Sequence, residues 1–230
     1  MVSVDDEGAA SALKRELGAL RSLRHPHVIS LLATCDDEDE GRLWALLEFA
    51  PHGSLHRLLH RATDEERLSA FGDVGTACFY RIAHEAASAM AFLHSRAVTH
   101  GDVKSANVLI CAGGAAKLAD FGLARVVSTS GFTRAAEQRG GTVAYMAPEL
   151  LDGGRRAHDA ESADVYALAV MYAEILTRKE PFADAQHDVT IALRVRAGER
   201  PALPKNLPTA LKDLLAKCWT GPHKGDCRER

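Results

Sequence analysis

The stretch His100–Asn107, with the sequence HGDVKSAN, decides the fold assignment together with two later motifs, Asp120–Gly122 (DFG) and Ala147–Glu149 (APE). Two short apolar runs, Val108–Ile110 and Ala116–Leu118, lie between the first two motifs and predict a β-hairpin with a Gly-Gly turn. An aspartate in a loop is usually a turn or cap residue. Three motifs in this order, on loops beside a hairpin, instead predict that their polar side chains converge on one cleft.

These motifs resemble the catalytic loop, the metal-binding Asp-Phe-Gly motif and the end of the activation segment of eukaryotic protein kinases. The resemblance runs from about Leu13 to Trp219, which is nearly the whole chain. Lys104 and the stretch Gly141–Met146 are similar to those of serine/threonine kinases. Within that class the chain resembles the tyrosine-kinase-like group, which includes the Pelle and interleukin-receptor-associated kinases. The resemblance implies an α+β, protein-kinase-like fold with two lobes.

The resemblance also implies roles for four residues of these motifs. Phosphoryl transfer needs in-line positioning and neutralisation of the charge on the phosphate oxygens, with little covalent chemistry from the protein. Asp102 would orient the attacking hydroxyl of a protein substrate and accept its proton, and Lys104 would contact the transferring phosphate. Asn107 and Asp120 would supply the hard oxygen ligands that Mg²⁺ prefers. The expected cofactors are therefore ATP and Mg²⁺.

Five further positions resemble residues that surround the nucleotide in kinases. Leu47 is similar to the gatekeeper, and Glu48 and Ala50 belong to a segment similar to the hinge whose backbone bonds adenine. Leu109 falls where a side chain packs beneath adenine. Glu16 lies on the apolar face of a predicted helix, where a carboxylate needs a cation. In kinases its equivalent pairs with a strand lysine, and a solvated surface position is the alternative for this glutamate.

Two more positions resemble residues that support the site in kinases. His100 falls in the regulatory spine of the family and is expected to be tied from below by Asp164. Gly101 stands where many kinases carry an arginine that pairs with a phosphorylated activation loop. Without that guanidinium, we expect activity that does not depend strongly on such phosphorylation.

Hydrophobic periodicity predicts strands early in the chain and helices late, which by itself indicates an α+β protein. Ser54 precedes a short apolar run and is expected to cap a helix that extends to about His60. The stretch that follows, to Gly75, is polar and poorly patterned. The other predicted elements are helices at about Ala10–Arg24, Phe79–Leu93, Val165–Leu176 and Leu211–Cys218, and strands at Val28–Cys35 and Trp44–Ala50.

Composition argues against several other classes of protein. The net charge of −3 gives no basic field that would attract nucleic acid or an anionic membrane. The five cysteines are odd in number and form no C-x-x-C pair, so neither a disulfide framework nor a zinc cage is expected. The eleven histidines are scattered, without an H-E-x-x-H, so the sequence does not favour a histidine metal site either.

No signal peptide is visible, because the first twenty residues are mixed and charged. The most apolar long run, Ala163–Leu176, contains two acids and is too short to cross a bilayer. We therefore expect a cytoplasmic location, either as a separate protein or as the cytoplasmic part of a larger or membrane-anchored one. The expected partner is a protein substrate, and we expect no binding to nucleic acid.

The sequence departs from the kinase pattern before Glu16, where it has neither a G-x-G-x-x-G loop nor a Val-Ala-x-Lys strand. We expect residues 1–50 to form an incomplete, β-rich N-lobe and residues 51–230 to form a mainly helical C-lobe that lacks its last helix. Met1 is expected to be an internal methionine, with the missing lysine immediately upstream. The alternative function is a catalytically impaired pseudokinase that acts as a protein-interaction scaffold.

Overall fold

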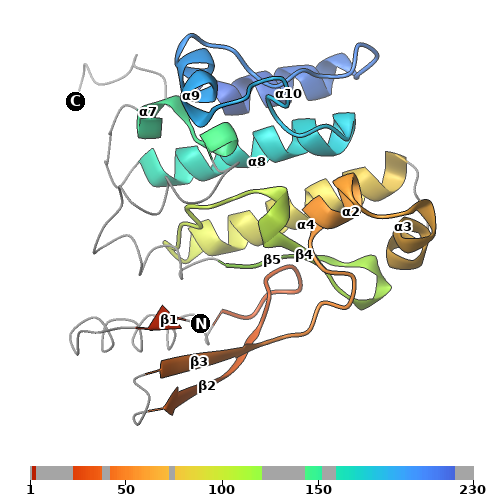
Figure 1. The fold of residues 1–230 in the computed structure, drawn as a ribbon, viewed down its shortest axis with the longest axis vertical. Helices are drawn as coiled ribbons and strands as arrows, with labels where there is room; N and C mark the ends of the chain where they lie inside the picture. The colour runs from red at the N-terminus through yellow and green to blue at the C-terminus, as the bar shows by residue number, and fades with distance from the viewer. Residues whose placement is uncertain are drawn as a thin grey trace.

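A small sheet and a stack of helices make up the part of the chain that the computed structural model describes, residues 2–3, 23–37, 42–72, 76–120, 143–151 and 159–220. Figure 1 shows the sheet at one end of the molecule, the helices at the other, and a β-hairpin between them. This mixture of elements is the predicted α+β fold. Glu16, Phe121, Gly122 and Met1 lie outside the described residues.

The sheet has the strand order β1–β3–β2, with β1 at Val2–Ser3, β2 at Leu31–Asp37 and β3 at Arg42–Leu47. Both pairings are antiparallel, and Cys35 lies opposite Trp44. The predicted bounds, Val28–Cys35 and Trp44–Ala50, are therefore wrong at both ends. Apolar periodicity misses the polar ends of these strands, which take part in the ladder through their backbone.

The hairpin is confirmed, with β4 at Val108–Ile110 and β5 at Ala116–Leu118 in antiparallel register. Its turn, η2 at Ala112–Gly114, has φ values of 74° at Gly113 and 76° at Gly114, in the left-handed region that favours glycine. The free edge of β5 pairs with an earlier segment. Leu118 donates its N–H to the carbonyl of His27 at 2.9 Å and accepts from the N–H of Ile29 at 2.8 Å. Residues 27–29 thus pair with the hairpin and do not extend β2.

The first described helix is α2, Leu55–His60, and it begins where the sequence predicts. The hydroxyl of its N-cap, Ser54, accepts from the backbone N–H of Arg57 at 3.3 Å. A second helix, α3 at Asp64–Phe71, follows in the stretch that periodicity leaves unassigned. Its start is fixed by a capping box, in which Thr63 and Glu66 each accept from the other's backbone N–H. The T-x-x-E pattern was the signal that hydrophobic periodicity did not detect.

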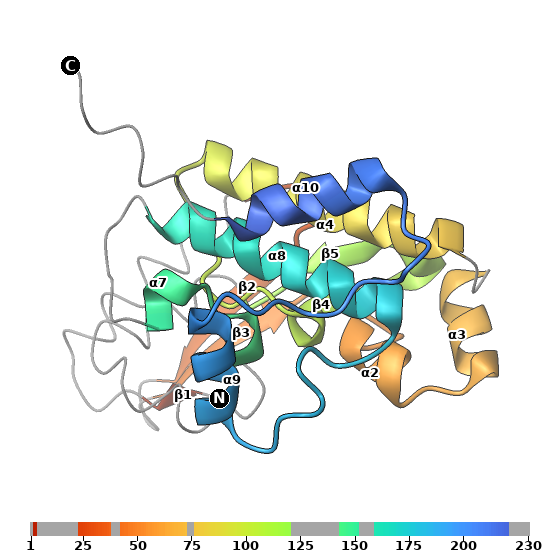
Figure 2. The ribbon, with the colours of Figure 1, turned by 90° about the horizontal axis from the view of Figure 1, so that it is seen from above.

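The helical stack consists of three long helices with shorter ones beside them. Figure 2 shows α10 lying over α8 and α4, and α8 packs against both of the others. The polar N–H of Trp219, in α10, and the hydroxyl of Tyr166, in α8, are buried without a hydrogen-bond partner among the described residues. The helices are α4 at Thr76–Ser95, α7 at Pro148–Leu151, α8 at Asp159–Thr177, α9 at Asp188–Arg196 and α10 at Thr209–Trp219.

Helix α8 is the centre of the core, because Val170, Met171 and Ile175 are almost completely buried. The predicted helix at Val165–Leu176 is confirmed as part of α8, in which Val165 is 36% exposed and the adjacent Asp164 is turned inward at 2%. The predicted helices at Phe79–Leu93 and Leu211–Cys218 are confirmed as parts of α4 and α10. Within the described ranges, every helix is too short or too polar to cross a bilayer.

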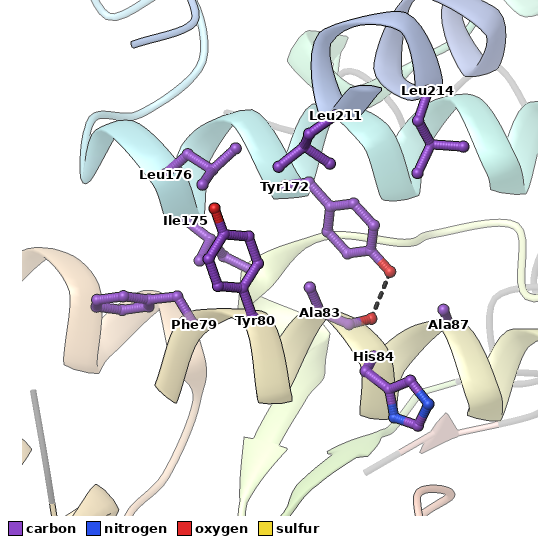
Figure 3. Close-up of a pocket in the computed structure, with 10 residues that line it drawn as sticks. All are labelled: Phe79, Tyr80, Ala83, His84, Ala87, Tyr172, Ile175, Leu176, Leu211 and Leu214. Carbon is purple, nitrogen blue, oxygen red and sulfur yellow. Dashed lines mark hydrogen bonds between the residues drawn. The ribbon is translucent and has the colours of Figure 1, made fainter. Parts of the chain in front are cut away.

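A pocket opens between α4, α8 and α10, on the side chains shown in Figure 3. Most of the side chains that line it are apolar, and the hydroxyl of Tyr172 donates to the backbone carbonyl of Ala83 and joins α8 to α4. Leu214 and Tyr80 at its rim are 53% and 43% exposed. None of the residues that line this pocket belongs to the three sequence motifs.

Candidate active site

The hairpin places the HGDVKSAN loop beside the aspartate of the DFG motif. The loop ends in a short helix, η1 at Ser105–Asn107, which leads directly into β4. The N–H of Ala119, at the end of β5, donates to the carbonyl of Asn107 at 2.8 Å. Asp120 follows Ala119 directly, so the two ends of the hairpin carry Asn107 and Asp120 side by side. This is the convergence that the order of the motifs predicts.

Asp102, Lys104 and Asn107 form one polar cluster. The ammonium of Lys104 lies 2.8 Å from Oδ2 of Asp102, and both side chains are largely buried, with exposed fractions of 14% and 8%. The amide Nδ2 of Asn107 donates to the same Oδ2 at 2.9 Å and to the Asp102 carbonyl at 2.7 Å. Because Nδ2 faces two acceptors on Asp102, the oxygen Oδ1 of Asn107 is turned away from Asp102.

Asp164 of α8 holds the backbone at the start of this loop, as the resemblance implies. Its buried carboxylate accepts from the N–H of His100 and the N–H of Gly101, each at 2.8 Å, and from Nε2 of His94 at 2.9 Å. Charge-assisted bonds of this kind are about twice as strong as neutral ones. The carboxylate therefore fixes the backbone from which Asp102 projects.

His100 links the loop to the end of the hairpin. Its Nε2 donates to the carbonyl of Ala119 at 3.0 Å, and its Nδ1 accepts from the N–H of Asp102 at 3.3 Å. Burial lowers the pKa of His100 below its ordinary value, although Asp164 and Asp102 oppose the shift. The neutral imidazole is the form that both hydrogen bonds require, one as donor and one as acceptor.

Asp120 is exposed, in contrast to Asp102 and Asn107, which are buried. Its φ of 60° lies in the left-handed region, which aspartate tolerates better than most residues. The chain thus turns sharply where it leaves the hairpin. Asp120 follows Ala119, whose N–H donates to the Asn107 carbonyl. An exposed carboxylate at this position is a suitable oxygen ligand for a divalent cation.

A second group of predicted residues lies where the sheet meets the hairpin. Leu47 is the last residue of β3 and is half-buried, and the carbonyl of Ala50 accepts from the N–H of Gly53 at 3.1 Å. Ser54 forms an isolated bridge with Leu109 of β4, which is half-buried as well. The segment after β3 is thereby joined to the hairpin that carries the polar cluster.

Glu48 has a partner that sequence reasoning missed. Its carboxylate pairs with the ammonium of Lys117 in β5 at 2.5 Å and accepts from the N–H of Ser30 at 3.3 Å. Burial alone would raise the pKa of Glu48, but its hydrogen bonds to Lys117 and Ser30 outweigh it, so the pKa lies below its ordinary value. Lys117 is the middle residue of the three-residue strand β5, and nothing in its local sequence distinguishes it from a surface lysine.

Sequence reasoning also missed a buried acid behind the loop, Glu174 of α8. Its carboxylate accepts from the hydroxyls of Ser105 and Tyr145, each at 2.7 Å, and from Nε2 of His60 at 2.8 Å. The signal that could have found it is an acid within the apolar run Val165–Leu176, because a fully buried carboxylate must be hydrogen-bonded.

A carboxylate, an amide and a lysine at one end of a hairpin, with a second carboxylate at the other end, define a phosphotransferase site of the protein kinase class. The chain belongs to the protein tyrosine and serine/threonine kinase family, whose sequence profile matches residues 2–225. Members of this family use ATP and Mg²⁺ and act on proteins. This confirms the family resemblance and the kinase fold.

Several curated kinases are similar to this chain over most of its length. It is 30% identical to mitogen-activated protein kinase kinase kinase 1a of Physcomitrium patens over 223 residues, which is 94% of this chain and 27% of the relative. It is 32% identical to receptor-interacting serine/threonine-protein kinase 2 of Bos taurus, over 89% of this chain and 39% of the relative. It is 38% identical to salt tolerance receptor-like cytoplasmic kinase 1 of Oryza sativa subsp. japonica, over 78% of this chain and 49% of the relative. The chain thus spans between about a quarter and a half of the length of these relatives.

Proposed function

We propose that this chain is the kinase domain of a serine/threonine protein kinase, which transfers the γ-phosphate of ATP to a hydroxyl of a protein substrate. The observation that carries the proposal is the cluster of Asp102, Lys104 and Asn107, tied through Ala119 to Asp120. The serine/threonine preference rests on Lys104 and on the names of the relatives. The relatives named above are longer than this chain, so the specific substrate depends on the whole protein.

Asp102 is the residue that we assign to the acceptor hydroxyl. With an ammonium and an amide on its Oδ2, Asp102 is held in one orientation, as a base that positions a hydroxyl must be. Lys104 lies 2.8 Å from that oxygen, close enough to approach a phosphate on the same side. We assign it to the charge of the transferring phosphate.

Asn107 and Asp120 would hold Mg²⁺. The fit rests on the donor set. Nδ2 of Asn107 donates to Asp102, so Oδ1 points away from Asp102. The exposed carboxylate of Asp120 belongs to the residue after Ala119, whose N–H donates to the Asn107 carbonyl. Both are the hard oxygen donors that Mg²⁺ prefers. When bound, Mg²⁺ neutralises charge on the phosphate oxygens.

We place the adenine at the junction formed by Leu47, Glu48, Ala50 and Leu109, with residues 1–50 and 51–230 as the two lobes on either side. The Glu48–Lys117 ion pair and the pairing of residues 27–29 with β5 support this placement, since they fix the sheet against the hairpin. Glu16 would complete the phosphate side by pairing with a lysine. We propose a cytoplasmic location, as the name of the rice relative states for that protein.

The test is a phosphotransfer assay on the full-length protein, with radiolabelled ATP, Mg²⁺, casein as acceptor and phosphoamino-acid analysis. Asp102→Asn keeps the size of the side chain but removes the base, so transfer should fall by about a hundredfold or more. Asp184→Asn is the matched control, because Asp184 is 71% exposed and its ion pair within the described part of the chain is with Arg194, far in sequence from the motifs. This control should transfer phosphate at the wild-type rate.

Three results would count against the proposal. If Asp102→Asn transferred phosphate as fast as the wild type, the assignment of Asp102 would be wrong. If the wild-type protein bound ATP but transferred nothing in any condition, the pseudokinase alternative would replace the catalytic one. Phosphate found on tyrosine alone would contradict the serine/threonine assignment.

A further inference from the structure

A group of histidine and glutamate side chains lies behind the HGDVKSAN loop, where α2 meets α8. Figures 1 and 2 both show α2 beside the C-terminal half of α8. His56 and His60 are one helical turn apart on α2, so they share a face, and their ring centroids are 4.8 Å apart. Glu174 faces them from α8. One ligand atom from each of these three residues lies within 4.8 Å of the others.

Glu174 is already held as an inner ligand would be. Its side chain is completely buried, and two hydroxyl groups, of Ser105 and Tyr145, donate to it at 2.7 Å. Hydrogen bonds from a second layer of residues orient carboxylate ligands in the same way in established metal sites.

Glu180, on the segment after α8, supplies a fourth candidate ligand. Its Oε1 lies 3.1 Å from Nε2 of His56, and its side chain is 56% exposed, so it can move without disturbing the core. Two neutral imidazoles and two carboxylates carry a charge of about −2, which a divalent cation would neutralise. The hydrogen bonds His60–Glu174 and His56–Glu180 would be exchanged for bonds to the ion.

We propose that His56, His60, Glu174 and Glu180 form a site for a divalent transition-metal ion of the zinc class. Imidazole nitrogens suit zinc and its neighbours, whereas Mg²⁺ and Ca²⁺ prefer all-oxygen sets. A tetrahedral ion with bonds of about 2.0–2.1 Å separates its ligand atoms by roughly 3.3 Å. The ligand atoms of His56, His60 and Glu174 lie within 4.8 Å of one another. Rotation of His56, which is 25% exposed, can bring its nitrogen closer to His60 and Glu174, which are already 2.8 Å apart.

The sequence alone argued against a histidine metal site, because the chain has no H-E-x-x-H. The fold supplies what the local sequence does not, by placing a buried carboxylate of α8 opposite two histidines of α2. The site is separate from the proposed Mg²⁺ ligands, Asn107 and Asp120. It meets the same loop at Ser105, which lies between Lys104 and Asn107 and donates to Glu174.

The experiment is a titration of the purified, metal-free protein with Co²⁺, which reports tetrahedral coordination through its visible absorption, followed by displacement with Zn²⁺. His56→Gln and His60→Gln keep a hydrogen-bond donor but remove the imidazole ligand. His187→Gln is the matched control, because His187 is an exposed histidine outside the cluster. His56→Gln lies at the partly exposed edge of the site, so it tests the proposal even if His60→Gln folds poorly.

We expect one Co²⁺ per chain with a tetrahedral spectrum, displaced by Zn²⁺ and unchanged in His187→Gln. Each of the two cluster variants should bind at least about tenfold more weakly. The proposal is overturned if no tetrahedral cobalt species forms, or if both cluster variants bind as tightly as the wild type. A sulfur-to-cobalt charge-transfer band would also overturn it, since it would place the ion on cysteine, such as the exposed Cys35.

Discussion

Replacing Asp164 with asparagine should weaken both the fold and the candidate active site. The Asp164 carboxylate is 2% exposed and accepts from three donors, the N–H groups of His100 and Gly101 and Nε2 of His94. An asparagine keeps one oxygen and presents an NH₂ group where the second oxygen stood. At least one donor is then left buried and facing another donor.

The size of the effect follows from these contacts. A buried donor left without a partner costs about 1–3 kcal/mol, and the bonds that remain are weaker because the acceptor is no longer charged, so we expect a total loss of about 2–4 kcal/mol. For a domain of this size that loss lowers the melting temperature by roughly 5–15 °C. Most domains have about 5–15 kcal/mol of stability, so Asp164→Asn should still fold.

Urea unfolding followed by circular dichroism measures the loss, and an unchanged slope against urea shows that the folded state is intact. Asp184→Asn is again the control, because it makes the same chemical change at a position that is 71% exposed. It should not differ measurably from the wild type. If the two variants lost the same small amount of stability, the view that Asp164 anchors the loop backbone would be refuted.

Three other substitutions test separate parts of the structure. In Gly114→Ala the new Cβ would lie 2.6 Å from the backbone oxygen of Ala70. In Gly113→Ala, at a φ of the same sign, the new Cβ would meet nothing within 4 Å. Urea unfolding should therefore show a far larger loss of stability for Gly114→Ala, and equal losses would contradict this. The pKa of His100 is lowered in the folded state, so as the pH falls below about 6.5 the unfolded chain takes up a proton before the folded protein does. The free energy of unfolding therefore decreases as the pH falls below that value. Melting temperatures at pH 8.0 and 5.5 should therefore differ more for the wild type than for His100→Gln, and an unchanged difference would contradict the shift. Tyr172→Phe removes one hydrogen bond between α8 and α4 and should cost about 1 kcal/mol, without changing phosphotransfer, while a large loss of activity would show that this pocket is coupled to the site.

The hairpin and the polar cluster could be predicted from sequence because their signals are local. The two three-residue strands have turn glycines between them, and the motif residues are fixed within a few positions of the strand ends. Ser54 at the start of α2 is a local signal of the same kind. Such signals survive because backbone geometry near a turn or a helix start depends on few neighbours.

The remaining parts depend on contacts between distant segments. Lys117 pairs with Glu48 across 69 positions, and Glu174 accepts from His60 across 114 positions, so neither partner is visible in its own stretch of sequence. Helix α9 has no predicted range of its own because its main apolar residues, Val189, Ile191, Leu193 and Val195, alternate at a spacing of two, which is typical of a strand, and only Ile191 and Val195 are buried. The predicted start of the first strand, Val28, was wrong because residues 27–29 pair with β5 and not with β3.

The most direct test of the kinase assignment is the effect of Mg²⁺ on ATP binding, measured by calorimetry for the full-length wild-type protein and for Asp120→Asn. If Asp120 holds the ion that bridges to the phosphates, Mg²⁺ should tighten ATP binding to the wild type, and this gain should be lost in Asp120→Asn. Asp102→Asn should keep the gain, because Asp102 is assigned to the acceptor hydroxyl and not to the metal. An equal gain in Asp120→Asn and in the wild type, or no gain in the wild type, would contradict the assignment.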